Sequence, residues 1–342
     1  MSTAYLYSER FLEHAEPGHP ERPDRLRAIM ELLQTSGTLA RMQPLDFEAA
    51  TPEQVSAVHQ PRYVQNLREL SARGGGRLDA DTYVTPHSYD IALLAAGACV
   101  ALADAVQRQQ VDNGIAFVRP PGHHATSARG MGFCLLNNVA IAARYLIDTH
   151  KLSRVMIVDY DVHHGNGTEN IFYEDPRVLY VSTHQFPLYP GTGHWRDIGA
   201  GEGLGTTLNV PLPPGVGDRG FQHVFDELIR PLAERFGPQL VFLSAGFDAH
   251  HRDPLANMQL SVAGYAGLTR SLKQLTEELC GGRFAVVLEG GYDLDAIAQS
   301  VLAVCRVLLG DTQIPDPLGP ATEPEENVED YVHQLKAFHL LV

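Results

Sequence analysis

The chain has 342 residues, of which 44% are hydrophobic, and its formal net charge is −15 at pH 7. This length and composition predict one large globular domain, and the acidic balance argues against direct nucleic-acid binding. No signal peptide and no run of about 18 apolar residues is evident, so we expect a cytoplasmic protein that does not contact membranes. The four cysteines have no CxxC spacing and lie in or beside apolar stretches, which is typical of reduced, buried thiols.

The first 107 residues predict elements that serve mainly for packing. We expect a strand over residues 3–7, an amphipathic helix over 26–33, a second helix over 51–70 and an alanine-rich helix over 91–107. Gly74-Gly75-Gly76 predicts a flexible loop. Arg25 stands at the start of the first helix, where an arginine is ordinarily solvated, so the residues alone give it no function.

Four apolar runs in the rest of the chain predict buried strands, and each leads into polar residues flanked by glycine. The strands are expected at residues 115–118, 155–158, 240–244 and 284–288. In that order, they lead into His123-His124, the segment 159–167, Asp248 and Tyr292. Strands that alternate with helices form parallel sheets, which bind ligands outside their carboxyl ends. We therefore expect these polar groups to meet in one site.

A further strand is expected over residues 178–183, and it leads into His184 and a glycine- and proline-rich stretch at 187–220. A loop of that length inside a compact domain is usually functional, and we expect only a short strand within it, at 208–210. Helices are expected over 138–147 and 220–236. After Gly310, a polar linker leads to a terminal helix from about Glu326.

The segment after the 155–158 strand has the composition of a metal site. Asp161 and His163 are two residues apart, so in extended chain their side chains point to the same side. Together with Asp248 they would give a metal three ligands and leave one position open, which is the arrangement of catalytic zinc. The alternative for Asp161 and His163 is a hydrogen-bonded pair that only holds a loop.

The remaining polar groups suit the hydrolysis of an amide through a tetrahedral intermediate. His123 and His124 would serve as general base and general acid near neutral pH. Asp159 and Asn166 are candidate acceptors that orient the two imidazole rings. Tyr292 follows two glycines and could donate its hydroxyl to a carbonyl that becomes an oxyanion.

Six motifs then resemble the zinc-dependent histone deacetylase family, and in particular its class II-like bacterial histone deacetylase-like amidohydrolases. They are RPPGHHA (119–125), GFCLLNN (132–138), DYDVHHGNGT (159–168), YPGTG (189–193), SAGFDAH (244–250) and LEGGYDL (288–294). The resemblance covers about residues 5–310. It implies a single-domain α/β fold of the arginase and deacetylase type, with a central eight-stranded parallel sheet flanked by helices. The catalytic domain would span residues 1–312, with a linker and a packing helix at 313–342.

The resemblance also assigns roles by position. It implies a zinc site at Asp161, His163 and Asp248, and catalytic roles for His123, His124, Tyr292, Asp159 and Asn166. It implies an acyl-lysine tunnel formed by Phe133, Tyr189, Leu255, Gly132, Gly291 and Asp81, although Phe is commoner in the family where Tyr189 stands. A structural potassium ion would bind at Asp159, Asp161, His163, Ser182 and Thr183, and Arg25 would lie beside an acetate channel. Asn166 is the residue of the class II branch.

The function implied is the zinc-dependent removal of acetyl or short acyl groups from lysine side chains or similar amines. The partner would be an acylated lysine peptide, a polyamine or another small amide. Polyamine-specific relatives carry glutamate where this chain has Leu255, which favours acyl-lysine, whereas the acidic surface weakly favours polyamines. Acyl length, iron in place of zinc, and a possible homo-oligomer stay open.

Two other function classes are less well supported. A dinuclear manganese ureohydrolase of the arginase type needs additional carboxylates, but Gly165 and His250 stand at those positions. A non-catalytic acyl-lysine binder would lack the catalytic tyrosine, whereas Tyr292 is present.

Overall fold

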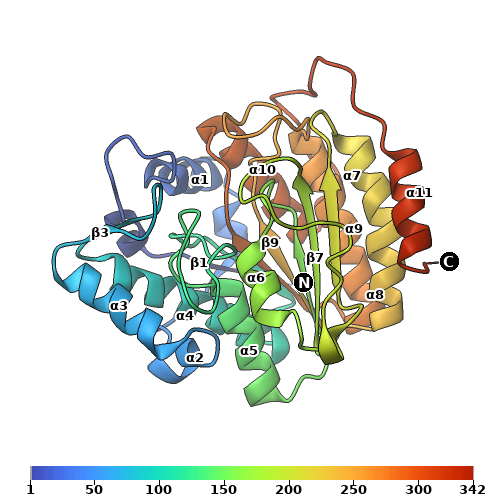
Figure 1. Ribbon diagram of the computed structural model, residues 1–342. Coiled ribbons are helices and arrows are strands. Elements are labelled where there is room, and N and C mark those ends of the chain that lie inside the picture. The colour runs from blue at the N-terminus through green and yellow to red at the C-terminus, as the bar shows by residue number, and fades with distance from the viewer. Residues whose placement is uncertain (1, 342) are drawn as a thin grey trace.

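Eight parallel strands form the central sheet of this computed structural model, which describes residues 2–341, and their order is β2-β1-β5-β10-β9-β6-β7-β8 (Figure 1). The strands are β1 Thr3–Leu6, β2 Gln43–Pro44, β5 Asn113–Ala116, β6 Val155–Asp159, β7 Val178–Gln185, β8 Thr207–Leu212, β9 Leu240–Ala245 and β10 Phe284–Leu288. The predicted α/β fold and its eight-stranded parallel sheet are therefore confirmed.

Every residue of the five central strands, β5, β10, β9, β6 and β7, is buried. Because both faces of such strands are covered, their sequences are continuous apolar runs rather than alternating ones. Val155-Met-Ile-Val158 of β6 shows this pattern, and the first charged group comes only at the last residue of the strand, Asp159.

Helices cover both faces of the sheet. They are α1 Asp24–Thr35, α2 Pro52–Ser56, α3 Pro61–Ala72, α4 Ser88–Gln107, α5 Asn138–His150, α6 Asn166–Phe172, α7 Asp218–Val224, α8 Arg230–Phe236, α9 Val262–Cys280, α10 Leu294–Leu308 and α11 Glu329–Phe338. Short 3-10 turns are η1 Glu9–Glu13, η2 Leu39–Arg41 and η3 Gly201–Gly203. One group of neighbouring helices runs from α3 through α4 and α5 to α6, and another from α1 through α10 and α9 to α7 (Figure 1). Strand β5 contacts both α4 and α10, one from each group.

The strand order opens a crevice at the carboxyl end of β6. After β6 the chain continues to β7 and β8 on one side, and later returns through β9 on the other side. Such reversals of strand order are where α/β sheets bind ligands. The register brings the ends together, because Asp159 of β6 pairs with Ser182 of β7 and Ser244 of β9.

Several predicted elements differ from the structure because of proline, long-range pairing or helix geometry. The single helix expected over 51–70 is two helices, since Pro61 begins α3 and cannot continue α2. The helix expected over 220–236 is α7, a π-helical segment η4 at Phe225–Ile229, and α8. The strand expected within a loop at 208–210 is β8, the edge of the main sheet.

Two further differences concern loops. Gly76 is not part of a free loop, because it begins β3 Gly76–Arg77, which pairs antiparallel with β4 Tyr83–Val84. His184 lies within β7 rather than after it. The terminal helix α11 begins at Glu329, three residues later than expected, and packs beside η4 and α7.

Helix α4 bears on the expectation that no segment of the chain is long and apolar enough to cross a membrane. By length and composition alone, this helix is. In the structure 67% of its most apolar window is buried, and the helix packs against α5, β5 and β10. This packing is typical of the core helix of a globular fold.

Candidate active site

Asp161, His163 and Asp248 converge just beyond the carboxyl ends of β6 and β9. His163 Nδ1 lies 3.2 Å from Asp161 Oδ1 and 3.1 Å from Asp248 Oδ2. One ligand atom from each residue lies within 4.8 Å of the others. The two carboxylates are buried, and the imidazole is nearly so. The structure therefore brings together the three predicted metal ligands.

These three residues fit a zinc ion in composition and in spacing. Nitrogen and oxygen ligands bind zinc at about 2.0 Å, so tetrahedral neighbours lie roughly 3.3 Å apart, close to the separations found here. Burial and Asp161 raise the pKa of Asp248. Two carboxylates buried side by side do not both stay ionised unless a cation lies beside them. A metal ion would supply that charge, and His163 would then bind it through a deprotonated ring nitrogen.

Two glycines allow the backbone to approach Asp161. A Cβ atom at Gly246 would lie 2.0 Å from Asp161 Oδ2, and one at Gly290 would lie 2.5 Å from it. At the second glycine, the close approach allows Gly290 N to donate a hydrogen bond to Asp161 Oδ2 at 2.8 Å. Any side chain at these positions would displace the carboxylate.

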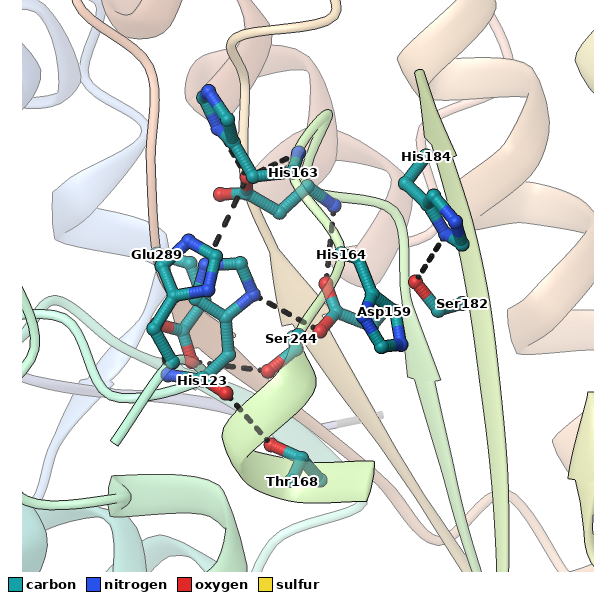
Figure 2. A network of polar contacts seen from close by, with 12 residues as sticks. His123, Asp159, His163, His164, Thr168, Ser182, His184, Ser244 and Glu289 are labelled. Atoms are coloured by element: carbon teal, nitrogen blue, oxygen red, sulfur yellow. Dashed lines mark hydrogen bonds and ion pairs between the residues drawn. The ribbon is translucent and has the colours of Figure 1, made fainter. Parts of the chain in front are cut away.

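His123 and His124 are each oriented by a different kind of partner. His123 Nδ1 lies 3.1 Å from Asp159 Oδ2, and Figure 2 shows the two side chains pointing toward one another. His124 Nδ1 lies 2.8 Å from Asn166 Oδ1. Both predicted orienting residues are thus in place, one a carboxylate and the other a neutral amide.

The surroundings of the two rings also separate their acid–base behaviour. Burial alone would lower the pKa of His123, but the carboxylates of Asp161 and Asp159 outweigh it and raise the pKa to about 10. Burial lowers the pKa of His124 well below its usual value, and the cationic rings of His123 and His163 lower it further. Environments that push two pKa values apart assign different roles to the two groups.

A cavity of about 230 Å³ opens onto these groups. Its lining residues are Asp81, His124, Gly132, Phe133, His163, Leu188, Tyr189, Leu255 and Tyr292. All but one of the predicted tunnel residues therefore lie together, and Leu188 was not predicted. Gly291 does not line the cavity. Its carbonyl oxygen accepts a hydrogen bond from the buried Arg25.

Aromatic rings form the walls of the cavity. Tyr292 packs edge-on against Phe133, with 5.8 Å between ring centroids, and Tyr189 packs edge-on against His124 at 5.2 Å. Gly132 stands where a Cβ atom would lie 2.4 Å from the His124 ring and 2.9 Å from Tyr189. Only glycine leaves the imidazole room beside this wall.

Arg25 is fully buried, which corrects the expectation of a solvated residue. Its guanidinium donates to the carbonyl oxygens of Gly291 at 2.6 Å and Glu289 at 2.5 Å, and Nη1 donates to Glu21 Oε1 at 3.0 Å. It also lies 5.1 Å from the centroid of the Tyr292 ring. Arg25 therefore braces the segment that leads to Tyr292, and its role beside an acetate channel stays a prediction.

Glu289 was missed in the sequence, although it directly precedes the two glycines. Its Oε2 accepts hydrogen bonds from Gly122 N at 2.7 Å and His123 N at 3.2 Å, and its Oε1 accepts one from Ser244 Oγ at 3.0 Å (Figure 2). Burial raises the pKa of this carboxyl to about 7. Glu289 therefore fixes the loop that carries the histidine pair. No local pattern reveals this, because the partners lie far away in sequence.

Three residues of the predicted potassium site, Asp159, Ser182 and Thr183, lie on the adjacent strands β6 and β7, and Asp161 and His163 follow β6. Asp159 of β6 is in register with Ser182 of β7, and Thr183 Oγ1 lies 3.5 Å from the Asp159 carbonyl oxygen. Ser182 Oγ lies 2.9 Å from His184 Nδ1 (Figure 2). Potassium itself stays a prediction.

Comparison with known proteins places the chain among deacetylases. A family model described as "Histone deacetylase domain" matches residues 19–308. The chain is 42% identical to "Histone deacetylase 14, chloroplastic" of Arabidopsis thaliana, over 96% of this chain and 83% of that protein. It is 40% identical to "Polyamine deacetylase HDAC10" of Homo sapiens, over 96% of this chain and 51% of that protein. The solved HDA15 HD domain superposes with a TM-score of 0.88 at 39% identity, covering 99% of this chain and 93% of that one.

Proposed function

This chain belongs to the histone deacetylase family, and we propose that it is a zinc-dependent amidohydrolase that removes acetyl or other short acyl groups from lysine side chains or similar amines. One observation carries the proposal. A single aromatic-walled cavity is lined by a metal ligand, His163, by a low-pKa histidine, His124, and by a tyrosine, Tyr292.

Asp161, His163 and Asp248 would hold the metal, and His163 also lines the cavity. A zinc ion bound there polarises the amide carbonyl and lowers the pKa of water to about 7. Asp161 Oδ2 and Asp248 Oδ1 also accept backbone hydrogen bonds from Gly290 and Val162, which hold the two carboxylates in orientation.

His124 is the group that moves the proton. It lines the cavity, which His123 does not, and burial favours the neutral form of its ring by lowering its pKa. A neutral imidazole can take a proton from the attacking water and return it to the leaving amine nitrogen. His123, held by the Asp159 carboxylate, would stabilise negative charge as it develops.

Tyr292 and the aromatic walls complete the reaction site. The phenolic hydroxyl would donate to the carbonyl oxygen as it becomes an oxyanion, an interaction that strengthens only in the transition state. Phe133 and Tyr189 would flank an aliphatic chain and exclude water from around it. A lysine side chain offers such an apolar stem below its acylated nitrogen.

Acetylpolyamines are the second candidate substrates. Asp81 supplies a carboxylate to the cavity wall, and it could pair with a secondary ammonium. The human relative is named a polyamine deacetylase. Leu255, however, also lines the cavity, and it is apolar where polyamine-specific relatives carry glutamate. We therefore favour acyl-lysine as the substrate.

The test is an activity panel on the zinc-loaded protein, followed by mass spectrometry. Acetyl-lysine peptides, acylated peptides of increasing chain length, acetylspermidine and arginine would be compared with the same substrates incubated with Tyr292→Phe. Release of acetate from the peptide, and a loss of about 10²–10³ in kcat for Tyr292→Phe, are expected. Hydrolysis of arginine, or no hydrolysis of any acyl amide, would refute the proposal.

A further inference from the structure

The backbone around Tyr292 has little rigidity of its own. It follows Gly290 and Gly291, and Gly291 adopts φ +112°, a conformation open mainly to glycine. Arg25 fixes the Gly291 carbonyl at 2.6 Å, before the tyrosine. At the tyrosine itself, the backbone N–H donates to Asp253 Oδ2 at 2.6 Å. The position of this side chain therefore depends on a carboxylate distant in sequence.

Asp253 is a buried carboxylate whose partners are all backbone groups. The residue is only 6% exposed to solvent. Oδ2 accepts hydrogen bonds from Tyr292 N and Asp293 N, the second at 3.3 Å, and Oδ1 accepts one from Leu255 N at 3.0 Å. Within residues 2–341 no cationic side chain forms an ion pair with it. Hydrogen bonds from these three N–H groups replace the bonds to water that the carboxylate loses on burial.

These bonds connect two residues that line the cavity, Leu255 and Tyr292. One carboxylate thus ties the backbone of a substrate-contacting residue to the backbone of the oxyanion donor. We propose that Asp253 is a positioning residue, which sets the place of the Tyr292 hydroxyl relative to the wall at Leu255. The proposal rests on the function proposed above.

Replacement by asparagine tests this arrangement at constant size. An amide has one oxygen and one NH₂ group, so one of the two sides must place N–H against N–H. Either Tyr292 or Leu255 loses its acceptor. A displacement of about 1 Å at a reacting group can lower a rate by about 10²-fold. Asp253→Asn should therefore lower kcat by about 10- to 10²-fold, with a smaller change in KM.

A double-mutant cycle distinguishes positioning from a general structural effect. If Asp253 acts through the Tyr292 hydroxyl, Asp253→Asn should lower kcat in the native chain but change it by less than about twofold in a Tyr292→Phe background. Asp295→Asn is the matched control. Its side chain is 74% exposed and pairs with Arg252, so the same chemical change there should leave kcat unaltered.

A second measurement does not depend on activity or on metal. Hydrogen–deuterium exchange should become faster in Asp253→Asn, either at residues 289–295, where the Tyr292 amide loses its acceptor, or at residues 254–257, where the Leu255 amide loses it. Both segments should stay native in Asp295→Asn. Unchanged exchange, or equal losses of kcat in both backgrounds, would overturn the positioning role. If the native chain hydrolysed no acyl amide, the proposed function would fail, and the exchange result would still decide whether Asp253 holds Tyr292.

Discussion

Glu21 and Arg119 lie 98 residues apart in the sequence, and their fully buried side chains pair, with Arg119 Nη2 2.7 Å from Glu21 Oε2. Arg25 bonds the other oxygen of the same carboxylate. Burial alone would raise the pKa of Glu21, but Arg119 and Arg25 outweigh it and hold the pKa at about 2. Arg25 in turn donates hydrogen bonds to the carbonyl oxygens of Glu289 and Gly291, which precede Tyr292. This ion cluster therefore helps to fix the position of the tyrosine.

Glu21→Gln should therefore destabilise the protein by about 3–5 kcal/mol at pH 7, because it leaves two buried guanidinium groups short of a counter-charge. The native pKa lies below the value of about 4.3 in the unfolded chain, so this stabilisation is present above pH 4.3 and is lost as pH falls through about 2. Urea unfolding at pH 7, 5 and 3.5 measures both effects.

Glu277→Gln, on the surface of α9, is the control for that experiment and should change stability by less than about 0.5 kcal/mol. A difference between Glu21→Gln and the native chain that grew as the pH fell would contradict the buried-pair account.

Asp248→Ala should abolish metal binding. The variant removes one of three ligand atoms, and neither Asp161 nor His163 can supply the missing oxygen. We expect about one equivalent of zinc in the native chain, a small fraction of that in the variant, and nearly no turnover. Metal analysis of the dialysed proteins gives the answer. Asp330→Ala, an exposed change on α11, should retain the metal, and full occupancy in Asp248→Ala would remove Asp248 from the site.

The sequence predicted the strands and the motif residues of this site, but it did not predict the contacts that join distant segments. Phe284–Leu288 is the strand that the apolar run predicts, and Asp159, His123, His124 and Asn166 lie where their motifs indicate. Local composition is enough in these cases because burial determines the strands and their ends share one edge of the sheet.

Partners that are distant in the sequence could not be predicted in the same way. Without the family resemblance, the local sequence indicates only a solvated arginine at position 25, yet Glu21 and two carbonyl groups enclose its side chain. Asp253 and Glu289 bond backbone N–H groups on other segments, a relationship with no residue-type signature. Strand β8 was likewise read as part of a loop, because only its pairing with β7 makes it the sheet edge.

Asn166→Asp should change the pH dependence of the reaction. A carboxylate beside His124 Nδ1 would favour the imidazolium, and would raise the pKa of that ring by about one unit or more. If the neutral His124 is the base, the acidic limb of the kcat profile moves to higher pH by the same amount. Profiles between pH 3.5 and 9 test this, because the pKa of His124 in the native chain lies well below its usual value. Asn166→Ala should lower kcat without moving the acidic limb to higher pH. An unmoved limb in Asn166→Asp would exclude His124 as the base.

The last prediction concerns substrate choice at the wall of the cavity. Leu255 is apolar and lines the cavity together with Asp81. A glutamate at position 255 would place a second carboxylate there, in surroundings where charge pairs are stronger than in water. Leu255→Glu should therefore raise kcat/KM for acetylspermidine relative to an acetyl-lysine peptide, by about tenfold if the pair gains 1.4 kcal/mol.

The native chain should prefer the peptide, and Leu255→Gln, which has the size of glutamate without its charge, separates electrostatics from shape. Measuring kcat/KM for both substrates in all three proteins decides the matter. A ratio that changes equally in the glutamine and glutamate variants would mean that size alone acts at this position. A ratio unchanged in both would move specificity to other lining residues, such as Leu188 and Tyr189. In either case the metal site and the roles of His124 and Tyr292 would be unaffected, because Leu255 is not among the residues assigned to the metal or to the reaction.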